Sequence, residues 1–80
     1  MVQQDPSPTG FLTGGYSITT DFTNQFYLKA KSTLYSEYSF LQSMTISKVE
    51  EQIVSGKNYL FKIVNQTDTY VARVYVTLSL

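Results

Sequence analysis

The fold is decided by the stretch MTISKVEEQIVSGKNYLFKIV, residues 44–64. Its side chains alternate with a period of two, from Met44 to Val49 in the first half and from Tyr59 to Val64 in the second. This period is typical of β-strands, because successive side chains of a strand point to opposite faces. Ser55-Gly56 lies between the halves and favours a turn. The stretch therefore predicts two antiparallel strands joined by a tight connection.

A third strand is expected after this pair. The residues from Asn65 to Asp68 are a cluster of turn formers, and residues 70–80 are rich in β-branched and aromatic side chains. Asn65-Gln66-Thr67 also fits the acceptor pattern for N-glycosylation, but these residues are more simply explained as part of the turn.

One helix is expected before the sheet. Thr20-Asp21 is a helix-start signal, since both residue types cap helices well. The apolar stripe that follows at helical spacing covers about 160° of a helix surface, which is wide enough to face a core. Its members are Phe22, Phe26, Tyr27, Ala30, Leu34 and Tyr38. The sequence therefore predicts an α+β domain, with one N-terminal helix packed across an antiparallel β-sheet.

The N-terminal segment differs from the rest in composition. Residues 1–9 contain Pro6 and Pro8, are polar and lack periodicity, which is typical of a flexible tail. Glycines then flank the apolar pair Phe11-Leu12, which either docks against a partner or begins a strand. With 80 residues, the chain is expected to form one domain, residues 1–80.

Composition excludes several function classes. The chain has no Cys and no His, which removes the usual zinc sites and the Cys/His and Ser/His nucleophile pairs. Six basic residues are spread along the chain and balanced by six acidic ones, whereas a small nucleic-acid binder would carry clustered positive charge. No stretch is apolar enough for a membrane helix, and residues 1–6 lack the features of a signal peptide. We expect no enzyme, metal, cofactor, nucleic-acid partner or membrane partner, and either a cytoplasmic protein or a secreted one whose signal was removed.

Ile53 and Val54 are unusual residues to find beside a turn. If the strands end near Gln52, both side chains are exposed at the tip of the hairpin, where grouped apolar residues mark a contact surface. If the strand continues, only Ser55-Gly56 and its neighbours turn. Periodicity alone does not separate these two interpretations.

Gln52-Ile53-Val54-Ser55-Gly56 matches the Q-x-V-x-G signature of the cystatin superfamily, and Asn58-Tyr59 matches the usual continuation. Gly14-Gly15-Tyr16-Ser17 resembles the family's N-terminal glycine segment, and Arg73-Val74-Tyr75-Val76 resembles its strand before a second binding hairpin. The resemblance implies a cystatin-like fold with exposed apolar residues at the hairpin tip. It also implies tight, reversible inhibition of papain-like cysteine proteases of the cathepsin type. Because it has no Cys, the chain resembles the intracellular stefin type more than the secreted, disulfide-bonded cystatins.

Three protease-binding segments are implied by this resemblance. The first is the N-terminal segment, the second is the hairpin tip, and the third is the second binding hairpin at the end of the chain. Their residues are Leu12, Thr13, Gly14 and Gly15, then Gln52, Ile53, Val54, Ser55 and Gly56, then Leu78 and Ser79.

The end of the chain departs from the family pattern. The second hairpin usually carries Pro-Trp or Leu-Pro-His, whereas the matching place reads Leu78-Ser79-Leu80, so the final family strand is expected to be missing. Residues 71–80 would then be an exposed edge strand, through which a homodimer could form. An alternative hypothesis is therefore a non-inhibitory binding or assembly module of cystatin-like fold.

Overall fold

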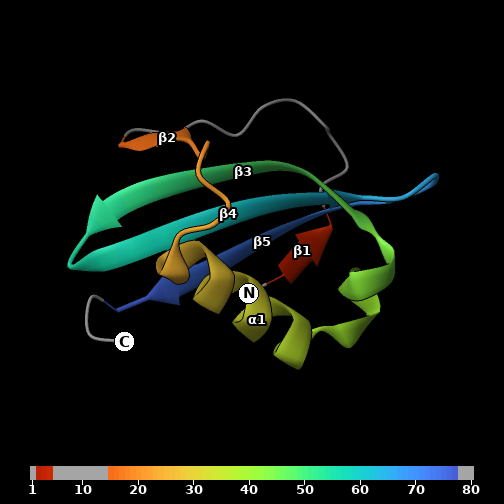
Figure 1. Cartoon of the computed structure of the whole chain (residues 1–80). Helices are drawn as coiled ribbons and strands as arrows, with labels where there is room; N and C mark the ends of the chain where they lie inside the picture. The colour runs from red at the N-terminus through yellow and green to blue at the C-terminus, as the bar shows by residue number, and fades with distance from the viewer. Residues whose placement is uncertain (1, 5–14, 78–80) are drawn as a thin grey trace.

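The computed structural model describes residues 2–4 and 15–77, and in this part of the chain one α-helix packs on a five-stranded antiparallel sheet. The predicted α+β class is confirmed (Figure 1). The strands lie in the order β1-β5-β4-β3-β2 across the sheet. The elements are β1 (Val2–Gln4), β2 (Tyr16–Ile18), α1 (Gln25–Glu37), the 3₁₀-helix η1 (Ser39–Ser43), β3 (Thr45–Val54), β4 (Gly56–Val64) and β5 (Thr69–Val76).

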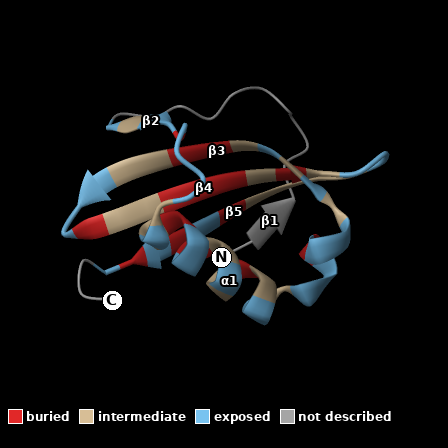
Figure 2. Ribbon diagram, in the orientation of Figure 1, coloured by how far each residue is buried: buried red, intermediate tan, exposed pale blue. Residues whose placement is uncertain are grey.

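The core lies between α1 and the face of the sheet that it covers (Figure 2). The middle of the predicted stripe supplies the helix side of the core, where Tyr27, Ala30 and Leu34 are buried. The sheet side comes mainly from alternate residues of β4 and β5, and its members are Val49, Tyr59, Phe61, Ile63, Ala72, Val74 and Val76. Period two in the strands and period 3.6 in the helix thus meet in one apolar layer.

The helix begins later than the sequence predicted. Thr20-Asp21 does not cap it, because the Asp21 carboxylate accepts hydrogen bonds from the Thr23 hydroxyl (2.6 Å) and backbone N–H (2.9 Å) and closes a local turn instead. These hydrogen bonds lower the pKa of Asp21. The cap is Asn24, whose Oδ1 accepts from two N–H groups of the first helical turn. Phe22, the first residue of the predicted stripe, therefore lies before the helix and is half-exposed.

The strands of the β3–β4 hairpin extend beyond Gln52. Of the two interpretations, the one in which the strands end near Gln52 is wrong, because β3 continues to Val54 and Val54 pairs with Gly56. Ser55 is the one residue between the two strands. The backbone thus follows the continuous-strand interpretation, and the side chains must be considered separately.

The N-terminal segment contains strands that the sequence analysis did not predict. Val2–Gln4 form β1 and pair with Tyr70, Val71 and Ala72 of β5, so the prediction of a flexible tail is wrong for these three residues. The prediction that residues 71–80 form an exposed edge strand is likewise wrong at Val71 and Ala72, because β1 pairs with both. Residues 5–9 and the pair Phe11-Leu12 lie outside the described residues. A strand of three residues carries too little periodicity to be recognised in a sequence.

The turn between β4 and β5 is confirmed. The Asn65 side-chain oxygen accepts hydrogen bonds from the backbone N–H groups of Thr67 (2.9 Å) and Asp68 (2.7 Å). The backbone N–H of Asn65 also donates to the Asp68 carbonyl at 3.0 Å. These bonds account for Asn65 without a modification, since a short polar side chain commonly closes a turn in this way.

Candidate functional site

The tip of the β3–β4 hairpin exposes two apolar side chains. Ile53 is 73% exposed and Val54 is 44% exposed, although both belong to β3. Because they are consecutive in a strand, they point to opposite faces of the hairpin. The tip is therefore apolar on both of its sides. The sequence linked exposure of these two side chains to strands that end near Gln52, but here both are exposed within a continuous strand.

Gln52 holds a second segment against the hairpin. Its side-chain oxygen accepts a hydrogen bond from the Asn58 amide at 3.0 Å, across the β3–β4 pair. On the other side of β3, Gln52 pairs with Tyr16 of β2. A Cβ added to the preceding Gly15 would lie 3.0 Å from Gln52 Nε2, so the glycine segment packs closely on this side chain.

The end of β5 lies on the other flank of the tip. Lys57 pairs with Val76, and a Cβ on Gly56 would lie 2.5 Å from the Val76 carbonyl oxygen. The beginning of β2, the hairpin tip and the end of β5 therefore meet at one end of the sheet, on the left in Figure 1. The structure brings Gly15 and the residues from Gln52 to Gly56 together at this end. Leu12, Thr13, Gly14, Leu78 and Ser79 lie outside the described residues.

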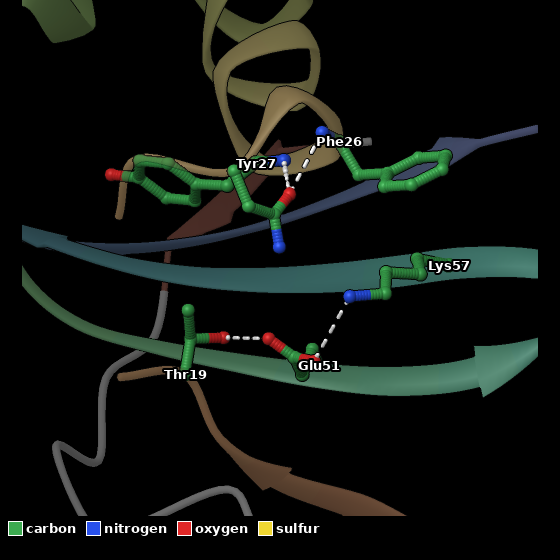
Figure 3. Close-up of polar contacts among 6 residues, drawn as sticks. Thr19, Phe26, Tyr27, Glu51 and Lys57 are labelled. Carbon is green, nitrogen blue, oxygen red and sulfur yellow. Dashed lines mark hydrogen bonds and ion pairs between the residues drawn. The ribbon is translucent and has the colours of Figure 1, made fainter. Parts of the chain in front are cut away.

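A polar network beneath the tip connects β4 to β3 and to the chain that enters the helix. The Lys57 ammonium lies 3.3 Å from Glu51 Oε2, and Thr19 donates to Glu51 Oε1 at 2.9 Å (Figure 3). Burial acts to lower the pKa of Lys57, but the hydrogen bond and charge of Glu51, together with Tyr59, outweigh it and raise that pKa. The same ammonium lies 5.6 Å from the centre of the Phe26 ring. These contacts fix the base of the hairpin against the first turn of α1.

The tip itself carries no charge. The residues from Gln52 to Gly56 are neutral, and the nearest charged residues in the chain, Glu51 and Lys57, are paired with each other below it. A surface of this kind gains its contact energy from apolar area and shape rather than from ion pairs.

Other kinds of site are not evident in the described residues. Residues 2–4 and 15–77 hold no group of three acidic, His or Cys side chains placed to bind a metal ion. No helix within the same ranges is both long and apolar enough to cross a membrane. A groove of about 410 Å³ opens between α1 and β3, because the helix packs mainly over β5 and β4.

Comparison with known proteins gives no significant match to any family model, curated protein or solved structure.

Two residues at this end of the molecule were not predicted as functional. Tyr75 is half-exposed and its hydroxyl donates a hydrogen bond to the Ser55 carbonyl at the tip. Lys57 forms the ion pair below the tip. The sequence carries only a weak signal for either one, because contacts between neighbouring strands depend on register, which the sequence analysis did not establish.

Proposed function

We propose that this chain is a cystatin-like, reversible inhibitor of papain-like cysteine proteases, closest to the stefin type. The observation that carries the proposal is the exposure of Ile53 and Val54 within the Q-x-V-x-G stretch, at the tip of a hairpin. The glycine segment at Gly15 and the end of β5 flank this tip, as a wedge of three segments requires.

The proposed mechanism needs no chemical step. The tip enters the active-site cleft and blocks substrate, and no bond forms with the catalytic thiol. The sheet already holds the backbone of the tip, so docking costs less conformational entropy than ordering a free peptide would. A standard protease–inhibitor contact buries about 800 Å² on each partner, and a neutral apolar tip suits the centre of such an interface.

The flanking segments have supporting roles in this proposal. Leu12 and Thr13 enter substrate subsites ahead of Gly14, and ordering such residues subtracts about 0.5–1.5 kcal/mol for each immobilised side chain. Leu78 and Ser79 contact the enzyme on the opposite flank. We therefore expect the two flanks to adjust affinity and selectivity, while the hairpin tip supplies the common contact.

Titration of papain or a cathepsin with the protein, followed with a fluorogenic peptide substrate, tests the proposal. We expect stoichiometric, reversible loss of activity, and no inhibition at micromolar protein would refute it. Val54→Asp places a charge at the centre of an apolar contact and is expected to weaken binding about 30-fold or more, the loss typical of a central interface residue. Val54 is only partly buried, so the free energy of unfolding should change by less than about 1 kcal/mol.

Phe40→Asp is the matched control for this variant. Phe40 is 51% exposed, close to the value for Val54, but it belongs to η1 at the opposite end of β3. Inhibition should persist in this variant, even if the loss of its ring contact with Tyr70 costs some stability. Equal loss of inhibition in both variants would show that the effect is not local to the tip.

The alternative of an assembly module predicts self-association through the edge of β5. Against it, β1 pairs with the first part of that strand, at Tyr70, Val71 and Ala72. Size-exclusion chromatography with light scattering distinguishes the two hypotheses. A monomer that inhibits papain supports the first, and a dimer without inhibition supports the second.

The cytoplasmic location stays a prediction, which fractionation of the source cells would check.

A further inference from the structure

Tyr75 reaches across the sheet to the tip of the β3–β4 hairpin. It lies on β5 opposite Asn58 of β4. Gly56 comes two residues before Asn58, so it lies on the same face of the sheet and nearer the tip. From this position the Tyr75 hydroxyl donates a hydrogen bond to the carbonyl of Ser55. The bond connects the tip to a third strand, in addition to the ladder between β3 and β4.

Gly56 provides the space through which the Tyr75 ring passes. A Cβ at this position would lie 2.7 Å from the Tyr75 hydroxyl oxygen and 2.9 Å from Cε1 of the ring. Real side chains avoid such distances, so a tyrosine in this rotamer requires a glycine beneath it. Gly56 and Tyr75 therefore form a matched pair, although they are far apart in the sequence.

The Ser55 carbonyl needs this partner because of where it lies. Ser55 is the one residue between the two strands, so it lies outside the ladder registered between Val54 and Gly56. Within residues 2–4 and 15–77, the Tyr75 hydroxyl gives this carbonyl a partner from β5, which adds to the closing pair of the hairpin itself. A tip that is fixed before docking loses less conformational freedom in the complex.

We propose that Tyr75 is a positioning residue, which holds the tip of the β3–β4 hairpin in its binding conformation through the Ser55 carbonyl. The effect on the free protein stands independently, and the effect on affinity rests on the proposed protease inhibition. In this proposal Tyr75 acts on the partner through the orientation of Ile53 and Val54.

Tyr75→Phe tests the proposal, since it removes the hydroxyl and keeps the ring. Tyr70→Phe is the matched control, because it makes the same change on the same strand next to the far turn. Backbone order parameters of Ser55 and Gly56 in the free protein should fall from the rigid range near 0.85 towards 0.6 in Tyr75→Phe alone. The looser tip must then be ordered in the complex with papain, and this cost should speed dissociation about three- to tenfold.

Each outcome decides between the parts of the proposal. Unchanged order parameters at the tip would overturn the positioning role, whatever happens with a protease. A more mobile tip with unchanged dissociation from papain would overturn its consequence for binding. If the unmodified protein does not inhibit papain while its tip responds to Tyr75→Phe, the positioning role stands and the proposed function fails. A loss of order spread over the whole sheet would overturn the local role of Tyr75.

Discussion

Replacing Gly56 by alanine should be the most damaging single-methyl change at the hairpin end of the sheet. Gly56 has φ +131°, a backbone conformation that L-residues rarely adopt. The new Cβ would also lie 2.5 Å from the Val76 carbonyl oxygen. That oxygen belongs to the backbone of β5, so it cannot move aside as the end of a flexible side chain could.

The two effects set the size of the loss. Holding a non-glycine residue in such a conformation costs about 1–3 kcal/mol, and forcing an extra carbon into a packed site costs about 1–3 kcal/mol more. A domain of this size is stable by about 4–12 kcal/mol at typical values per residue. Gly56→Ala should therefore lose a large part of this stability, about 2–6 kcal/mol, and its midpoint of thermal unfolding should fall by at least about 8 °C.

Gly15→Ala is the internal comparison for this measurement. Gly15 also has a positive φ of +84°, but the nearest atom to its added Cβ is Nε2 of Gln52, at 3.0 Å. Nε2 is the end of a flexible side chain, which can shift by a few tenths of an ångström even though Asn58 donates a hydrogen bond to the same amide group. The backbone strain is therefore the main cost of this substitution. Thermal unfolding followed by circular dichroism should show at most half the decrease seen with Gly56→Ala. Equal decreases, or no decrease for Gly56→Ala, would refute the argument from the contact with β5.

Two further predictions concern the scaffold. Leu34→Ala removes a side chain that is 1% exposed in the centre of the core, and chemical denaturation should show a loss of about 2–5 kcal/mol; a loss below about 1 kcal/mol would contradict its placement. Asn24→Ala removes the acceptor for the N–H groups of Phe26 and Tyr27 and should cost about 1 kcal/mol, whereas Asn24→Asp should keep most of that stability in the same assay. Equal losses in the two Asn24 variants would rule out the capping role.

The main elements were predictable because each has a strong local signal. The middle of the helical stripe is buried as expected, and the alternation of Tyr59, Phe61 and Ile63 places all three in the core. The helix start was misplaced at Thr20-Asp21, because Asp21 accepts hydrogen bonds from Thr23 in a local turn, and Asn24 caps the helix instead. Asn and Asp cap helices about equally well, so residue type alone does not place the start.

The hairpin shows the limit of the sequence most clearly. The order of residues from Gln52 to Gly56 supplied the pattern and the apolar pair. It did not decide between an early turn and a continuous strand, because two β-branched residues are compatible with both. In the structure the strand is continuous and both side chains are exposed. Ile53 shares the face of the core residue Val49, but α1 packs mainly over β5 and β4, and Val54 points to the opposite face of the sheet.

By itself, the sequence determined the helix, the three long strands and the neutral apolar segment at the hairpin, because all of these depend on neighbours in the chain. Only the tertiary structure decided that β1 covers the start of the β5 edge, and that Gly15 packs on Gln52. It alone also decided that Tyr75 reaches Ser55 over Gly56. These contacts depend on strand order and register, and a shift of register by one residue would turn every side chain involved to the other face.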